Sequence, residues 1–77
     1  MKVYVYCSAA HFNDECTDIK DVQVFLTETE AVDYLNNTIL QLTSEEGGWT
    51  ILSKFDHHYQ LTDGDEEYVA FVTDREL

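Results

Sequence analysis

The clearest pattern of apolar and polar positions lies between Glu28 and Leu42. Apolar residues recur there at steps of three and four, the spacing that places side chains on one side of an α-helix. They are Ala31, Val32, Leu35, Ile39 and Leu42. Thr27 stands just before this stretch as a helix-capping residue, and Glu30, three positions later, completes the pattern of a capping box. The spacing therefore predicts one amphipathic helix whose apolar stripe packs on a sheet.

The residues before this helix favour β-strands. Val3–Cys7 is almost entirely β-branched or aromatic. Because this stretch has no polar interruption, we expect a central strand that is covered on both faces, or one covered by tyrosine rings on its outer face. Asp21–Leu26 alternates instead, which places Val22, Val24 and Leu26 on one face of a second strand. The two strands are predicted to be antiparallel neighbours.

The residues after the helix also favour strands. Trp49–Leu61 is one long extended run, with a bend or bulge predicted near Lys54–His57. The dipeptide Asp63-Gly64 predicts a hairpin, and Glu67–Thr73 is the final strand. The order strand-strand-helix-strand-strand predicts a single α+β domain over residues 1–77. We expect a four-stranded, mainly antiparallel sheet with one helix packed on one face.

Two connections are predicted to be irregular. Ser8–Lys20 is polar and long for a hairpin loop, and long loops are often functional. The alternative is a widened hairpin with Phe12 folded back onto the core. Ser44–Gly48 is predicted to be a turn in which Gly47 or Gly48 supplies the left-handed residue that ends the helix.

Net charge is the most unusual property of the sequence. Sixteen Asp and Glu residues face four Lys and Arg residues, which gives a formal net charge of −12 over 77 residues. Nucleic-acid affinity depends on Lys and Arg neutralising phosphates, so this composition argues against direct binding to DNA or RNA. A strongly acidic surface attracts basic partners instead. A basic protein surface is therefore the predicted partner, and a solvated acidic surface without a partner is the alternative.

Cysteine and histidine residues raise three further hypotheses. The residues concerned are Cys7, His11, Cys16, His57 and His58. Their side chains are those that bind zinc, but the C-x3-H-x4-C spacing does not match a known zinc motif. Cys7 and Cys16 could also form a disulfide, and either thiol beside a histidine could act as a nucleophile. Neither thiol lies in a catalytic signature, so we expect a protein that is not an enzyme and has no metal site or cofactor.

The acidic residues of the two polar loops are the predicted contact site. A folded scaffold holds their carboxylates at fixed separations, with tyrosine and asparagine side chains nearby. Such an arrangement imitates a phosphate backbone, and a basic nucleic-acid channel on another protein could accept it. The residues predicted to contact the partner are Asp14, Glu15, Asp18, Asp63, Asp65, Glu66 and Glu67.

Two segments carry a resemblance to known proteins. Met1–Val5 is a short strand, and Val24–Leu35 runs from a strand into a helix that opens with the T-x-x-x-A pattern of Thr27 and Ala31. Together they resemble small phage and prophage accessory proteins, over less than half of the chain. The resemblance implies a phage accessory product and assigns no functional residue. Compact acidic phage products of this size include anti-CRISPR proteins and other DNA mimics that inhibit host enzymes or defence systems.

Charge and resemblance together favour an acidic, non-enzymatic, phage-encoded inhibitor. We expect it to bind a basic nucleic-acid-binding surface of a host protein or a defence complex such as a CRISPR effector, and to block nucleic-acid access. One alternative is an interaction domain or homodimer that uses a strand edge or the tyrosine-rich face of Val3–Tyr6. A Cys/His zinc protein is the third hypothesis. Lys2 is followed by too few apolar residues for a signal peptide or a membrane span, so the host cytoplasm is the expected location.

Overall fold

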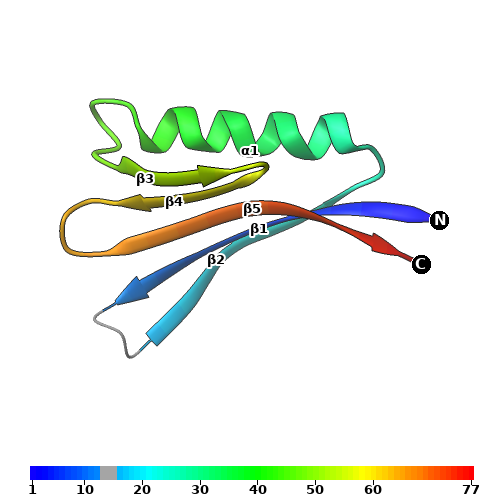
Figure 1. Ribbon diagram of the computed structural model, residues 1–77, viewed down its shortest axis with the longest axis horizontal. Helices are drawn as coiled ribbons and strands as arrows, with labels where there is room; N and C mark the ends of the chain where they lie inside the picture. Colours follow the sequence, from blue (N-terminus) through cyan, green and yellow to red (C-terminus); the bar gives the residue numbers. More distant parts are fainter. Residues whose placement is uncertain (13–15) are drawn as a thin grey trace.

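The computed structural model describes the backbone of residues 1–12 and 16–77 and the side chains of residues 1–10 and 18–77. Within these residues the chain forms five strands and one helix (Figure 1). They are β1 (Lys2–Phe12), β2 (Cys16–Phe25), α1 (Glu28–Leu42), β3 (Thr50–Phe55), β4 (His58–Thr62) and β5 (Glu67–Glu76). The described strands form one antiparallel sheet in the order β2-β1-β5-β4-β3. The predicted α+β class is confirmed, whereas the predicted number of four strands is wrong.

The additional strand comes from the segment predicted to be one extended run. Trp49–Leu61 contains a hairpin, in which β3 and β4 are joined by a two-residue turn at Asp56 and His57. Asp56 has a φ of 50°, in the left-handed region that aspartate adopts more readily than most residues. The bend predicted near Lys54–His57 is therefore a complete reversal of the chain.

The segment Ser8–Lys20, predicted to be a polar loop, is mostly strand. β1 continues to Phe12 and β2 begins at Cys16, and these two residues face each other across the hairpin. The register slips opposite Ser8, where β2 carries Lys20 as an extra residue, a β-bulge. β1 thus lies between β2 and β5, in the interior position predicted for it.

Helix α1 begins where the sequence predicts. Thr27 is extended, and its Oγ1 accepts the backbone N–H of Glu30 at 3.3 Å. The Glu30 carboxylate accepts the Thr27 hydroxyl at 2.9 Å, in place of the backbone N–H that a full capping box would use. The helix ends at Leu42 with Thr43 as its C-cap. The prediction that a glycine ends the helix is wrong, although Gly48 is left-handed with a φ of 75°.

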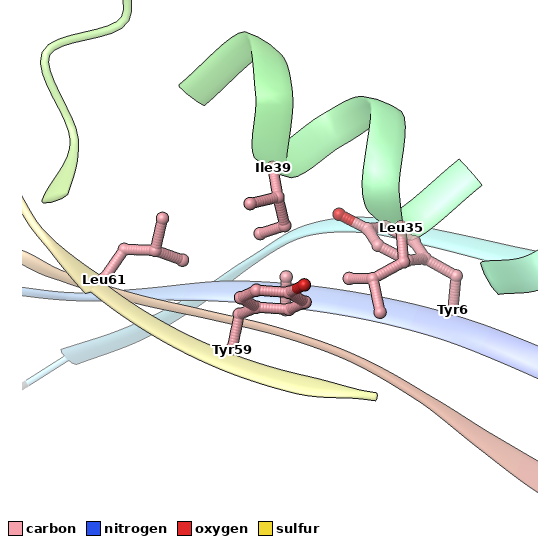
Figure 2. Packing of buried hydrophobic residues seen from close by; sticks show 6 residues of the cluster. Tyr6, Leu35, Ile39, Tyr59 and Leu61 are labelled. Atoms are coloured by element: carbon pink, nitrogen blue, oxygen red, sulfur yellow. The ribbon is translucent and has the colours of Figure 1, made fainter. Parts of the chain in front are cut away.

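The apolar stripe of α1 packs on one face of the sheet, which we call the covered face. Figure 2 shows Leu35 and Ile39 pointing from the helix toward the sheet, where they meet Tyr6 of β1 and Tyr59 and Leu61 of β4. Tyr6, Leu35 and Leu61 are fully buried. The buried residues of the helix are Ala31, Leu35 and Ile39. The predicted stripe is therefore confirmed, and it forms one core with the sheet.

The other face of the sheet, which we call the open face, carries no helix in the described part of the chain (Figure 1). Its side chains follow from the register, because successive residues of a strand point to opposite faces. They are Val3, Val5, Cys7, Ala9, Ile19, Val22, Val24, Thr50, Ser53, Phe55, His58, Gln60, Thr62, Glu67, Val69, Phe71, Thr73 and Arg75. Tyr6 lies under the helix and is fully buried, so its ring is not available to the interface predicted on the tyrosine-rich face of Val3–Tyr6.

Candidate functional site

Several connections of the fold meet at one end of the sheet. A single row of paired residues crosses the described strands there: Thr17, His11, Glu67, Thr62 and Thr50. Beyond this row lie the connections from α1 to β3 and from β4 to β5, on the same side of the molecule (Figure 1). We call the acidic residues of these connections and of the adjoining strand residues the acidic end. They are Asp18, Glu45, Glu46, Asp63, Asp65, Glu66 and Glu67.

The acidic end contains every described member of the predicted contact set. Those members are Asp18, Asp63, Asp65, Glu66 and Glu67. Asp14 and Glu15 lie outside the described residues. Glu45 and Glu46 belong to the same end but were not predicted, because the sequence places them far from both polar loops. Only the pairing of Thr50 with Thr62 shows that the connection from the helix reaches this end.

The loop between β4 and β5 is held by its own side chains. The Asp63 carboxylate accepts the backbone N–H groups of Asp65 at 2.9 Å and Glu66 at 2.8 Å. These two donors lower the pKa of Asp63, because they stabilise its charged form. The Thr62 hydroxyl donates to the Glu66 carbonyl at 2.8 Å. Asp63 therefore fixes the loop, and the exposed carboxylates of Asp65 and Glu67 are the ones available to a partner.

The first hairpin and this loop come together around Lys20. The Lys20 ammonium lies 2.9 Å from the Asp18 carboxylate. The pKa of Lys20 is raised, first by this hydrogen bond and, among further causes, by the charge of Glu66. Asp18 on β2 and Glu66 in the loop between β4 and β5 therefore both raise the pKa of the Lys20 ammonium. The pair is exposed and contributes little to stability, and within the described acidic end it leaves a large excess of negative charge.

A further acid, Asp21, has a structural role. The Tyr34 hydroxyl of α1 donates a short hydrogen bond to the Asp21 carboxylate of β2. This contact raises the pKa of Tyr34 to about 12 and lowers the pKa of Asp21. The Tyr34 ring also packs against Phe25 and, edge to face, against Tyr6 with ring centroids 4.8 Å apart. Asp21 therefore ties the helix to an outer strand of the sheet.

A cleft of about 490 Å³ lies at the opposite end, beside the turn between β3 and β4. Its polar lining includes Glu28, Asp56, His57, His58, Asp74 and Arg75. Asp74 is paired with Lys2 at 3.4 Å, and His58 stacks on Phe71. In the described part of the chain, no three His, Cys, Asp or Glu side chains are placed to hold a metal ion. Because none of the lining side chains is buried, we place the candidate site at the acidic end.

The cysteines are held apart by the register. Cys7, a half-buried free thiol, pairs with Val22, whereas Cys16 pairs with Phe12, five residues beyond Cys7 along β1. At about 3.3 Å per residue, the Cα atoms of the two cysteines are roughly 16 Å apart, and a disulfide needs less than about 7 Å. The disulfide hypothesis is therefore wrong, and the same separation keeps the two thiols from sharing one zinc ion.

Comparisons with known proteins identify no relative of this chain. No family model, no curated protein and no solved structure matches the chain. Among residues 1–12 and 16–77, no helix has the length and apolar character needed to span a membrane. Function must therefore be inferred from the residues of this chain alone.

Proposed function

We propose that this chain is an acidic, non-enzymatic inhibitor that binds a basic nucleic-acid-binding surface on a host protein and blocks the access of nucleic acid. The observation that carries the proposal is the acidic end. Carboxylates that are distant in the sequence gather there on two connections and on strands β2 and β5, and Lys20 is the basic side chain described beside them.

The geometry of the acidic end suits recognition of a basic surface. Neighbouring strands are spaced about 4.8 Å apart, so the Cα atoms of Asp18 on β2 and Glu67 on β5, which β1 separates, are held about 10 Å from each other. The Asp63 turn keeps Asp65 and Glu67 in place, which reduces the conformational entropy lost on binding. Lys and Arg side chains that normally bind phosphates can pair with such fixed carboxylates.

The class of target is proposed from charge and from resemblance. A net charge of −12 steers the protein toward basic surfaces, and nucleic-acid-binding surfaces are basic because their Lys and Arg side chains neutralise phosphates. The strand-to-helix junction at Thr27 resembles those of small phage accessory proteins. We therefore propose a phage-encoded product whose target is a nucleic-acid-binding defence complex such as a CRISPR effector.

A competition experiment tests this function. Purified CRISPR effector complexes loaded with guide RNA are mixed with a fluorescent DNA duplex, and bound DNA is measured by anisotropy as the chain is added. We expect DNA to be displaced at a fixed stoichiometry, with the intact mass of the effector unchanged. Direct binding of the chain to the effector should weaken steeply from about 0.1 M to about 1 M salt, because the Debye length falls from about 10 Å to about 3 Å.

Three results would contradict the proposal. The first is that no effector in the panel loses bound DNA. The second is binding that persists unchanged in about 1 M salt, where exposed charge pairs are screened. The third is a covalent change in the effector's mass, which would indicate catalysis instead of occupation of a surface.

A further inference from the structure

The open face of the sheet is apolar although it is exposed. Ile19 is 65% exposed, Val24 is 61% exposed and Phe55 is 77% exposed. Val22 and Val24 flank β1, where Val5 and Cys7 continue the same surface. Val69 and Phe71 of β5 lie on the other side of β1. Side chains from β2, β1 and β5 therefore form one continuous apolar patch, which no described residue of this chain covers, whereas Phe55 lies on β3 at the opposite edge of the sheet.

The sequence of the central strands shows that this face differs from an ordinary solvated face. An antiparallel sheet with one wet face has strands that alternate apolar and polar residues. β1 instead carries apolar residues on both of its faces. Tyr6 and Ala10 lie under the helix, and Val5, Cys7 and Ala9 lie on the open face. Such a strand is typical of a sheet buried on both sides. The open face therefore has the composition of a surface that becomes covered.

The distribution of charge limits what can cover it. The central part of the open face, from Ile19, Ala9 and Val69 to Val24, Val5 and Thr73, includes no Asp, Glu, Lys or Arg among its described side chains, although the chain carries a net charge of −12. Two oppositely charged residues, Glu67 and Arg75, lie on this face at the two ends of β5. A basic partner finds only Glu67 there to pair with, so most of its cations would be buried without counterions. A second copy of this chain offers the same largely uncharged surface, and this face is where two such acidic molecules repel each other least.

The area of the face is sufficient for a reversible dimer. The five described strands, about 4.8 Å apart, make it about 24 Å wide, and roughly six residues along each strand make it about 20 Å long. The footprint is then about 500 Å² on each copy and about 1,000 Å² in total. That value meets the lower limit for a specific interface.

We propose that two copies of this chain pack open face against open face about a two-fold axis. The two sheets would lie about 10 Å apart as in a β-sandwich, with a helix on each outer side. An axis that runs across the strands places the two acidic ends at opposite ends of the dimer, which minimises their repulsion. The dimer does not depend on the proposed function, because its apolar contacts come from the central part of the open face, and Glu67 is the only described residue of the acidic end that also lies on this face by the strand register.

Sedimentation velocity of the full chain tests the dimer from micromolar to several hundred micromolar concentration. We expect the mass to rise from 8.9 kDa toward twice that value. Val24→Lys should weaken dimerisation about 100-fold or more, since it buries an unpaired cation in the interface. Leu40→Lys is the matched control, because Leu40 is 69% exposed on the outer side of α1 and undergoes the same charge change. It should dimerise as the original chain does.

Circular dichroism of Val24→Lys, and of Val22→Lys as a second open-face variant, separates lost dimerisation from lost folding. Both positions are at least 50% exposed, so the folded spectrum should be retained. A chain that stays at 8.9 kDa at every concentration would overturn the proposal. So would a dimer that withstands both open-face substitutions, because its interface would then lie at a strand edge or elsewhere.

Discussion

The two faces of the sheet contain similar apolar residues but occupy different environments. On the covered face, Tyr6, Leu61 and Ala70 are completely buried beneath α1. On the open face, Val22 and Val24 remain at least half exposed. The difference arises because the single helix of the described chain, which follows β2 and begins at Glu28, packs on only one side of the sheet (Figure 1).

This difference separates folding from recognition. Stability of the monomer comes from contacts between the covered face and the apolar stripe of α1. The open face and the acidic end make few of those contacts, so their residues can be changed with little effect on folding. Binding surfaces can then be tested by substitution without unfolding the protein.

The largest expected effect is on the covered face. Leu35→Ala removes a fully buried side chain from the core and should reduce the free energy of unfolding by about 2–5 kcal/mol. Leu40→Ala makes the same change on the outer side of the same helix, and its effect should stay within about 0.5 kcal/mol. Urea denaturation followed by circular dichroism gives both values. Equal losses in the two variants would show that the core has been assigned to the wrong side of the helix.

A smaller effect is expected where the helix is tied to β2. Tyr34→Phe keeps the ring contacts but removes the hydrogen bond to Asp21, and should cost about 1 kcal/mol near neutral pH. The pKa of Tyr34 is raised to about 12 in the folded state, whereas an unfolded tyrosine titrates near about 10. The stabilisation is therefore complete below about pH 10 and is lost as the pH rises toward about 12.

Urea denaturation of the original chain and of Tyr34→Phe at several alkaline pH values measures this dependence. The difference in unfolding free energy should be constant up to about pH 10 and shrink above it. If the difference in unfolding free energy between the two proteins stays constant to about pH 12, the hydrogen bond to Asp21 does not raise the pKa of Tyr34 in the folded state.

The smallest effect is expected at the acidic end, in the loop that Asp63 holds. The pKa of Asp63 is lowered in the folded state by the two N–H groups it accepts. Its contribution to stability is therefore present above the unfolded pKa of about 3.9 and is lost as the pH falls below that value. When the unfolding free energy is measured as the pH is lowered below about 4, it should fall slightly less steeply for Asp63→Asn than for the original chain. Asp65→Asn is the matched control, because no backbone N–H donates to the side chain that it changes in this loop. An identical fall in all three proteins would contradict this role for Asp63.

Local patterns predicted the helix and its N-terminal cap accurately. Both depend on residues within a few positions of each other, namely Thr27, Glu30 and the apolar stripe. The turn at Asp56 was missed because it contains no glycine, and the left-handed conformation falls on an aspartate. The extension of β1 to Phe12 was missed because the polar residues of the segment looked like a loop, while its pairing with β2 and β5 is non-local.

The acidic end could be predicted only in part for the same reason. The loops that contain Asp18 and Asp63 are visible in the sequence as polar stretches. Their proximity depends on β1 lying between β2 and β5, a sheet order that no local pattern contains. Glu45 and Glu46 reach the same end through the pairing of β3 with β4. The open face was missed because the uninterrupted apolar residues of Val3–Cys7 favoured a strand covered on both faces, although one helix was predicted on one face.

Two triple variants with the same net charge test most directly whether the acidic end is the binding surface. Asp18→Asn, Asp65→Asn and Glu67→Gln neutralise the acidic end while leaving Asp63 to hold its loop. Glu28→Gln, Asp33→Asn and Asp56→Asn neutralise three exposed acids away from it. Both variants carry a net charge of −9, that is −12 + 3. The measurement is the concentration that displaces half of the DNA from the inhibited effector.

The first variant should need about ten times more protein, since three exposed charge pairs contribute about 0.5 kcal/mol each. The second variant should stay within about twofold of the original chain, because long-range steering changes little between −12 and −9. Equal losses in the two variants would show that net charge alone drives binding. A loss confined to the second variant would place the binding surface away from the acidic end.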